Sequence, residues 1–374
     1  MVKKNLSIFI LFILVVSACQ NVPQTPQATV TSYDLVETET LLSEVDTATP
    51  AIEDTPTSVE TATAIPEYAI LEPDTLNRLQ QVASATVQSP VSISWSADSQ
   101  KIGVLSVSGF SIYSAENGAL LKSITLSDPY RLLDASISRE EVAVTTDQQT
   151  VEFRSMDTGD VVSSFTTDEL FLSGSFSPDG FEFITTSGYS ITAQIWDIET
   201  GQLVNTVEGF ETAAPVYNAR YNDQGTGLIW TARATVQVYD LQSGQFGAVM
   251  GHEEFVSSSD LAPNGRLLAA AAAGTIDGDY QPLIRLWDAF GGQILGDLQN
   301  GDSIANHVHF SPDGTMLLVA ENADASIWSV QDQTRIWQLP AQGSSIRDAR
   351  FAPDRKAIVT VADDGNLLIL RVIK

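Results

Sequence analysis

The sequence predicts an all-β fold, a seven-bladed β-propeller built from four-stranded antiparallel blades. The pentapeptide FSPDG occurs twice, at 176–180 and 310–314, and degenerate copies divide the chain into units of about 40–50 residues, a period typical of propellers. Each copy is followed by the same succession of apolar strands and turns. The last unit lacks a fourth strand, while one apolar segment before the first unit has no unit of its own.

The pentapeptide has the composition of a tight turn between two strands. Proline fixes φ, the aspartate side chain hydrogen-bonds the nearby backbone, and glycine adopts a positive φ. Seven anchors with this pattern are present: WSADS at 95–99, ISREE at 137–141, FSPDG at 176–180, YNDQG at 221–225, LAPNG at 261–265, FSPDG at 310–314 and FAPDR at 351–355.

The residues after each anchor predict three further strands. An apolar run comes first, then a turn and an alternating strand that ends near an aspartate, then a last apolar strand. The clearest examples of the third strand and its following turn are TAQIWDIETGQ at 192–202, VQVYDLQSGQ at 236–245 and IRLWDAFGGQ at 284–293.

FSPDG together with IWD and LWD resembles the WD-repeat β-propellers, over roughly residues 76–374. Trp196-Asp197 and Trp287-Asp288 keep the Trp-Asp pair of that family, and Gly251-His252 alone keeps its Gly-His pair. The resemblance implies that the family's buried Asp–His–Ser/Thr–Trp network is mostly absent here. We therefore expect the blades to pack through apolar and small residues.

The two ends of the propeller are expected to complete one blade together. The segment LNRLQQVAS at 76–84 precedes the first anchor, and the final strand at 366–372 would otherwise leave an unpaired edge. We predict that these two segments pair and close the ring.

The first 18 residues read as a secretory signal, with two lysines, an apolar stretch and small residues before Cys19. The segment Val16-Ser17-Ala18-Cys19 resembles the bacterial lipobox, which implies that Cys19 is acylated and becomes the first mature residue. Cys19 is the only cysteine of the chain, and a lone cysteine in an exported protein needs a role. The alternative is an ordinary signal peptide that happens to contain a cysteine.

Residues 19–73 are rich in Thr, Pro, Glu and Ala and contain no lysine or arginine. Low hydrophobicity with charge of one sign predicts a disordered tether, with the propeller following at 74–374. The whole chain has a formal charge of −28, and residues 74–374 contain 37 acidic residues against 17 basic ones. This excludes nucleic acid as an expected partner, since phosphate binding needs a basic surface. We expect contact with a membrane only through the lipid.

No arrangement of residues typical of a catalytic site is found, and we expect neither a cofactor nor a resident metal. His307 and His309 share one face of a strand, but a metal would need at least a third ligand. Asp277 and Asp279 form an acidic glycine-containing loop without the spacing of a calcium-binding loop. Calcium binding at that loop stays open.

Two sets of residues are candidates for binding. Arg220, His309 and Arg350 each stand one residue before an anchor aromatic, so they are expected either to line the central channel, where they could hold an anion, or to pair between blades. The family resemblance implies a docking face where the loops entering the inner strands gather. The aromatic candidates near that face are Tyr130, Phe210, Phe255 and Tyr280.

These features favour a lipid-anchored extracytoplasmic binding propeller, a monomer that binds a protein partner in the cell envelope. It would be held on the outer face of the cytoplasmic membrane, or on an outer membrane if one exists. The alternatives are a glycan or small-ligand sensor and a propeller enzyme. An enzyme would need carboxylates that converge at the channel, which the sequence alone does not show.

Overall fold

The computed structural model describes residues 66–127, 130–187, 192–209, 218–276, 278–299, 303–339 and 342–374. All of these belong to one compact unit, Thr63–Lys374. The predictions on the signal, Cys19, the tether, Phe210 and Asp277 lie outside the described residues. No helix among the described residues is long and apolar enough to cross a membrane.

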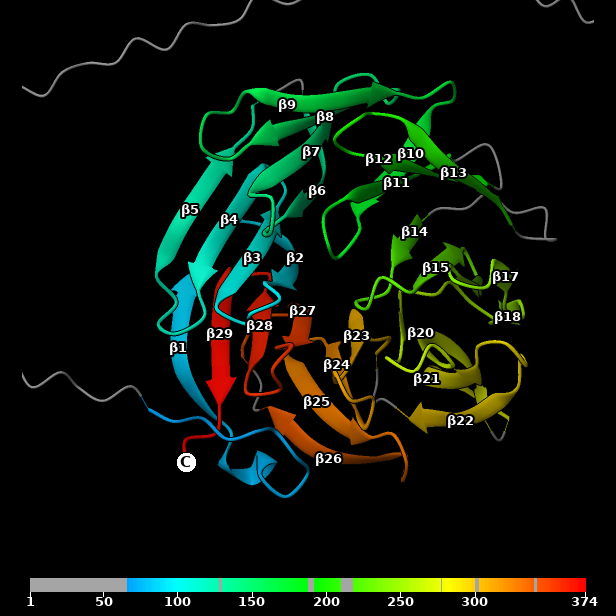
Figure 1. Ribbon diagram of the computed structural model, residues 1–374. Coiled ribbons are helices and arrows are strands. Elements are labelled where there is room, and N and C mark those ends of the chain that lie inside the picture. The colour runs from blue at the N-terminus through cyan, green and yellow to red at the C-terminus, as the bar shows by residue number, and fades with distance from the viewer. Residues whose placement is uncertain are drawn as a thin grey trace, which may run out of the picture. The chain divides into compact units, whose positions relative to one another are not determined.

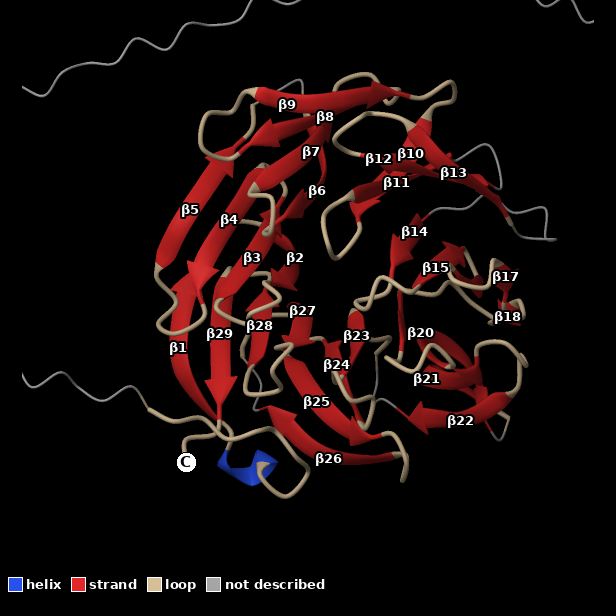
Figure 2. Ribbon diagram, in the orientation of Figure 1, coloured by secondary structure: helices blue, strands red, loops and turns tan. Residues whose placement is uncertain are grey.

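Almost all regular structure in the described residues is β-strand (Figure 2). Blade 1 contains β2 (Pro90–Trp95), β3 (Lys101–Ser106), β4 (Gly109–Ser114) and β5 (Leu120–Thr125). Blade 2 contains β6 (Arg131–Ser136), β7 (Glu141–Thr145), β8 (Thr150–Ser155) and β9 (Val161–Thr166). Blade 3 contains β10 (Phe171–Phe176), β11 (Glu182–Ser187), β12 (Thr192–Asp197) and β13 (Leu203–Glu208).

Blade 4 has a divided outer strand. It contains β14 (Asn218–Tyr221), β15 (Gly227–Ala232) and β16 (Thr235–Asp240), with β17 (Gln245–Phe246) and β18 (Met250–Gly251) both paired to β16. Blade 5 contains β19 (Ser258–Leu261), β20 (Leu267–Ile276), β21 (Asp279–Asp288) and β22 (Ile294–Gln299). Blade 6 contains β23 (His307–Phe310), β24 (Met316–Glu321), β25 (Asp324–Ser329) and β26 (Thr334–Leu339). Blade 7 contains β27 (Ile346–Phe351), β28 (Ile358–Ala362), β29 (Asn366–Arg371) and β1 (Gln80–Thr86).

The seven blades of the described unit stand around a common axis, with β14, β23 and β27 among the strands nearest the centre (Figure 1). Contacts run from blade to blade around the whole ring, including β27 of blade 7 against β2 of blade 1. Each blade has four antiparallel positions, as the repeat predicted. The predicted all-β, seven-bladed propeller is therefore confirmed.

The anchor turns join the first two strands of each blade. Their fifth residue has a positive φ in six of the seven copies: Ser99, Gly180, Gly225, Gly265, Gly314 and Arg355. The copy in blade 2 corrects the sequence alignment, because Ala135 pairs with Val142 as Phe176 pairs with Phe183. The blade 2 anchor therefore begins at Ala135 and not at Ile137, which shifts its channel position to Asp134.

The predicted closure of the ring is confirmed. Strand β1 pairs with β29 in antiparallel register, from Gln80 opposite Arg371 to Thr86 opposite Asn366. Directly after β1, Val87 donates its N–H to the carbonyl of Gly365 at 2.8 Å. Gly365 has φ +87°, and a Cβ at this position would lie 2.0 Å from the Val87 carbonyl oxygen, so only glycine fits the approach.

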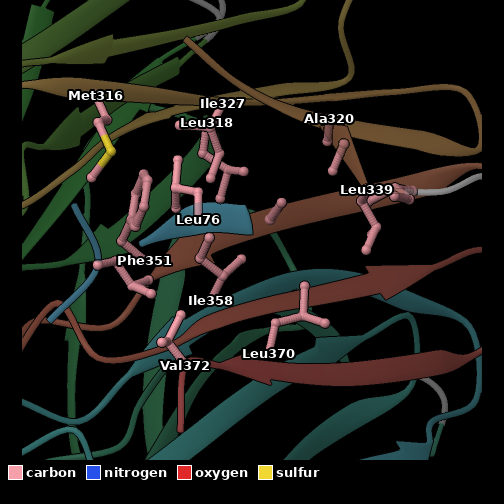
Figure 3. Close-up of a cluster of buried hydrophobic side chains, with 14 residues drawn as sticks. Leu76, Met316, Leu318, Ala320, Ile327, Leu339, Phe351, Ile358, Leu370 and Val372 are labelled. Atoms are coloured by element: carbon pink, nitrogen blue, oxygen red, sulfur yellow. The ribbon is translucent and has the colours of Figure 1, made fainter. Parts of the chain in front are cut away.

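Residues 66–79, which we call the strap, extend this closure upstream of β1. The Ala69 N–H donates to the Val372 carbonyl at 2.9 Å, and the Leu71 N–H donates to the Arg355 carbonyl at 2.7 Å. The strap includes the short 3₁₀ helix η1 (Leu76–Arg78). Leu71 and Leu76 are fully buried in an apolar cluster between blades 6 and 7, where Leu76 lies among side chains such as Leu318 (Figure 3).

Apolar side chains fill every boundary between neighbouring blades, and seven buried clusters account for the seven boundaries. The boundary of blades 2 and 3 is aromatic, with Trp196 stacked on Phe165 at 4.4 Å between ring centroids. A remnant of the family network survives there, because Trp196 Nε1 donates to Thr185 Oγ1 at 3.1 Å. Packing through apolar residues thus holds as expected, although polar contacts also join the blades, as described below.

The strap should contribute measurably to stability. Leu76→Ala would leave a cavity in the closing cluster, and we expect it to lower the free energy of unfolding by about 2–5 kcal/mol. Ile70→Ala removes an exposed strap side chain and is the matched control, with an expected change within about 0.5 kcal/mol. Urea unfolding of both variants measures the difference. Equal midpoints for the two would show that the strap does not hold the ring closed.

Candidate functional site

Arg220, His309 and Arg350 occupy equivalent positions, second from the end of the inner strands β14, β23 and β27. With the corrected register, the equivalent residues of the other four blades are Ser94, Asp134, Ser175 and Asp260. Five of these seven positions therefore carry a charged or titratable side chain: the three predicted residues and two aspartates, Asp134 and Asp260, that the sequence analysis did not single out.

These inner-strand side chains hydrogen-bond the backbone of the next blade. Asp134 Oδ2 accepts the Phe176 N–H at 2.9 Å, and Asp260 Oδ2 accepts the Phe310 N–H at 2.8 Å. His309 Nδ1 accepts the Phe351 N–H at 3.3 Å in the same way. Polar groups near the axis therefore link successive blades, in addition to the apolar clusters further out.

Asp348, two residues before Arg350 on β27, makes the corresponding link across the closing boundary. Its Oδ2 accepts the Ile93 N–H of blade 1 at 2.7 Å. Burial opposes the charge of this carboxylate, but the Arg350 charge and the Ile93 N–H outweigh it and hold the pKa of Asp348 below its usual range. Removing one partner of such a buried ion pair lowers the free energy of unfolding by about 3–5 kcal/mol.

His307 lies between Asp348 and Arg350. Its Nδ1 is 3.0 Å from Asp348 Oδ1, a contact without the geometry of a hydrogen bond, and its Nε2 is 3.4 Å from Arg350 NH2. Burial, together with the Arg350 charge, lowers the pKa of His307 to about 3. The imidazole is therefore neutral at physiological pH, and its Nε2 is the acceptor toward Arg350.

Asp223 joins three blades across the axis. It lies in the anchor turn of blade 4, yet its Oδ2 is 2.8 Å from His309 Nε2 of blade 6, and its Oδ1 is 3.9 Å from Arg350 NH1 of blade 7. Desolvation works against its charge, but His309, Arg350 and Arg220 hold the pKa of Asp223 well below its usual range. We call Arg220, Asp223, Asp260, His307, His309, Asp348 and Arg350 the axial cluster.

Each of the three predicted channel residues has a carboxylate partner in the axial cluster. Arg220 NH2 lies 3.3 Å from Asp260 Oδ1 and also donates to the Ser259 carbonyl at 2.5 Å. Arg350 Nε lies 3.3 Å from Asp348 Oδ2. The structure thus brings the predicted channel residues together as a paired network. Among the described residues no group of three or more His, Cys, Asp or Glu side chains is arranged to hold a metal ion.

The four aromatic candidates have different surroundings. Tyr130 is engaged with its own blade, since Arg154 lies over its ring at 4.4 Å and donates to its hydroxyl at 2.7 Å. Phe210 lies outside the described residues. Phe255 and Tyr280 are 58% and 60% exposed. Two of the four candidates are therefore available at the surface, and both belong to blade 5 or the loop entering it.

The loop that carries Phe255 is held against the tip of the β20–β21 hairpin. Glu253 accepts hydrogen bonds from the Thr275 N–H at 3.1 Å and from Thr275 Oγ1 at 2.9 Å. Thr275 is the cross-strand partner of Tyr280. Desolvation, together with the nearby Glu254 carboxylate, raises the pKa of Tyr280. Phe255 and Tyr280 are thus presented by one braced, acidic surface, to which exposed Asp279 also belongs.

The surviving Gly-His and Trp-Asp elements meet in blade 5 without forming the hydrogen bond of the family network. His252 packs edge-on to Trp287, with 5.6 Å between ring centroids, and neither His252 Nε2 nor Trp287 Nε1 has a partner among the described residues. Burial, together with the Arg285 charge, lowers the pKa of His252 to about 4.

Two residues of the axial cluster, Asp260 and Asp223, escaped the sequence analysis although the repeat contains a signal for each of them. Asp260 stands one residue before its anchor, the same position as Arg220. Asp223 occupies the third position of its pentapeptide, where four other copies have proline. Comparing each repeat position across all seven units, and not only the cationic residues, would have found both.

The chain is a seven-bladed β-propeller similar to WD-repeat proteins. It is 27% identical over 186 residues to the nuclear distribution protein PAC1-2 of Uncinocarpus reesii, covering 44% of this chain and 37% of that protein. It is 23% identical over 240 residues to the protein LST8 homolog of Drosophila melanogaster, covering 50% and 74%. It is also 23% identical over 158 residues to the WD repeat and SOCS box-containing protein 1 of Takifugu rubripes, covering 40% and 32%.

The chain spans about a third of the length of the first of these relatives. No family model matches the chain. The similarity therefore supports the repeat class, and the partners of this protein have to be argued from its own residues.

Thermal stability should fall as the pH drops from about 7.5 to about 5. The folded-state pKa values of His252 and His307, about 4 and about 3, lie below the ordinary value of 6.5. In that window the unfolded chain binds protons that the folded chain does not, so acidification favours unfolding. Measuring Tm at half-unit pH steps should show this decline, and His252→Gln should make it shallower. A Tm that is flat or rises on acidification would contradict the lowered folded-state pKa values of His252 and His307.

Proposed function

We propose that this protein is an exported, lipid-anchored propeller that binds a protein partner through the loop face of blade 5. The observation that carries the proposal is the pair of exposed aromatics, Phe255 and Tyr280, on a braced loop and hairpin tip. Large aromatic side chains dominate binding energy at protein interfaces, and presenting them on an ordered loop reduces the entropy lost on binding. Similarity to WD-repeat proteins supports a binding role over a catalytic one.

The chemistry of this surface favours a partner with basic and apolar side chains. Glu253 and Glu254 directly precede Phe255 on its loop, and Asp279 directly precedes Tyr280. Ile304, on the loop entering blade 6, is 37% exposed. Complementary charge would speed the encounter, while the aromatic rings would supply most of the affinity. The protein acts in this role as a monomer and without a catalytic step.

The docking surface is tested by the double variant Phe255→Ala/Tyr280→Ala. Crosslinking and capture with residues 66–374 from the organism's own envelope extract should identify a saturable partner, and the double variant should bind that purified partner at least about tenfold more weakly. Phe181→Ala is the matched control, because Phe181 is a 64% exposed aromatic in the anchor turn of blade 3, at the opposite end of the inner strands. Equal loss in the control, or no loss in the double variant, would exclude this surface.

The anchor is tested separately through Cys19. Cys19→Ala should abolish incorporation of a labelled fatty acid and release the protein from the membrane fraction into the soluble envelope fraction, since no other lipid attachment is proposed. Asn21→Ala leaves the segment Val16-Ser17-Ala18-Cys19 intact and should behave as the unaltered protein. Fatty-acid labelling that persists in Cys19→Ala would refute lipidation at this residue.

A further inference from the structure

Asp223 is an exception among the anchor turns. The equivalent residue is Pro178, Pro263, Pro312 or Pro353 in four blades, and it is Ala97 and Ile137 in the remaining two. The turn does not need the Asp223 side chain, because the buried Asn222 organises it, with Oδ1 accepting the N–H groups of Thr226 and Gly227 at 2.9 Å each. The carboxylate of Asp223 is therefore available for contacts with residues near the propeller axis.

Groups of the axial cluster bind the Asp223 carboxylate in a way that would also suit the carboxylate of a ligand. His309 Nδ1 accepts the Phe351 N–H, so the ring carries its hydrogen on Nε2 and donates it to Asp223. Arg350 NH1 faces the other carboxylate oxygen at 3.9 Å, an ionic contact too long for a hydrogen bond. A carboxylate that was not tied to the blade 4 turn could approach Arg350 more closely.

The groups that hold Asp223 are fixed by other partners. Arg350 is oriented by Asp348 at Nε and by His307 at NH2, and Arg220 is oriented by the Ser259 carbonyl and Asp260. Since these partners remain when Asp223 leaves, the donors would stay in place. Such preorganisation lowers the free energy that a ligand has to supply.

The blade 4 turn also has room to withdraw. Its Gln224 and Gly225 line an open pocket of about 300 Å³ that is completed by Ser177, Pro178, Asp179, Glu182 and Tyr221. The Asp223 side chain itself is 47% exposed. Movement of the turn toward blade 3 would therefore meet solvent and not packed core.

We propose that the axial cluster is a carboxylate-binding site, occupied by Asp223 in the free protein, from which the carboxylate of a ligand displaces it. Arg220 and Arg350 carry two positive charges, and Asp260 and Asp348, which accept the backbone N–H groups of Phe310 and Ile93, carry two negative charges. These four charges cancel, so a ligand with a single negative charge gives the site the same net charge as Asp223 does. The ligand is an acidic side chain or a chain-terminal carboxylate, and a phosphate dianion fits less well.

This site is independent of the proposed loop face. The axial cluster lies at the end of the inner strands that leads into the anchor turns, whereas the Phe255 loop enters β19 at the other end. Failure of either experiment therefore leaves the other proposal standing.

The test uses acetate as the probe and Asp223→Ala as the opened site. Residues 66–374 labelled with ¹⁵N at histidine give a simple spectrum, because the chain has only three histidines. At constant ionic strength, acetate should shift the His309 Nε2 resonance of Asp223→Ala at a concentration at least about tenfold lower than for the unaltered protein, in which Asp223 competes. Asp179→Ala, which removes a turn carboxylate outside the axial cluster, should behave as the unaltered protein.

Further variants keep the outcome decisive. Asp223→Pro installs the residue of four other turns and replaces Asp223→Ala if that variant does not fold. Peptides with a free or an amidated C-terminus, with and without an internal glutamate, then distinguish a terminal carboxylate from a side chain. Chloride producing the same shift as acetate, or acetate failing to move His309 in folded Asp223→Ala or Asp223→Pro, would overturn the proposal.

Discussion

A ring of blades is stable only if its last blade is complete, and here the two ends of the described unit supply that blade together. Without β1, strand β29 would present a row of unpaired N–H and C=O groups, an edge that invites association with other chains. The strap adds Leu71 and Leu76 to the cluster between blades 6 and 7. Closure therefore couples the stability of distant segments, and the geometry of the axial cluster depends on it, because its residues come from different blades.

The blades are joined at two radii by different kinds of contact. Further from the axis, the seven apolar clusters supply most of the stabilisation, as burial of apolar surface does in general. Near the axis, Asp134, Asp260, His309 and Asp348 accept backbone N–H groups of the next blade. A single such bond contributes only about 1 kcal/mol, but leaving its buried donor unpaired costs about 1–3 kcal/mol. These bonds therefore specify the alignment of neighbouring blades more than they add to stability.

The repeat predicted the fold because each strand and turn is specified locally. Alternating apolar residues, the positive-φ turn position and the missing fourth strand were sufficient for the blade count and for the pairing of β1 with β29. The register of blade 2 was not predictable in the same way, since its turn retains neither proline nor glycine. Most partners of Arg220, His309 and Arg350 come from other blades, with Asp260 and His307 in a neighbouring blade and Asp223 in a non-adjacent one. They depend on how the blades are arranged around the axis, and no local pattern contains that information. The contact of Tyr130 with Arg154 was not predictable for a similar reason, because the two residues are 24 positions apart in the sequence.

Repetition of one turn in all seven blades explains how a structural repeat can acquire a binding site at its axis. Seven copies of one turn need not all do the same work, because any turn that keeps its own hydrogen bonds releases its remaining positions. In blade 4, Asn222 makes the bonds that fix the turn, and the position that is proline in four other copies becomes Asp223. A carboxylate at this position removes no hydrogen bond from the turn, and it reaches His309 and Arg350 across the axis. Departures from the repeat that leave the local fold intact are therefore the positions whose side chains are available for contacts outside their own turn.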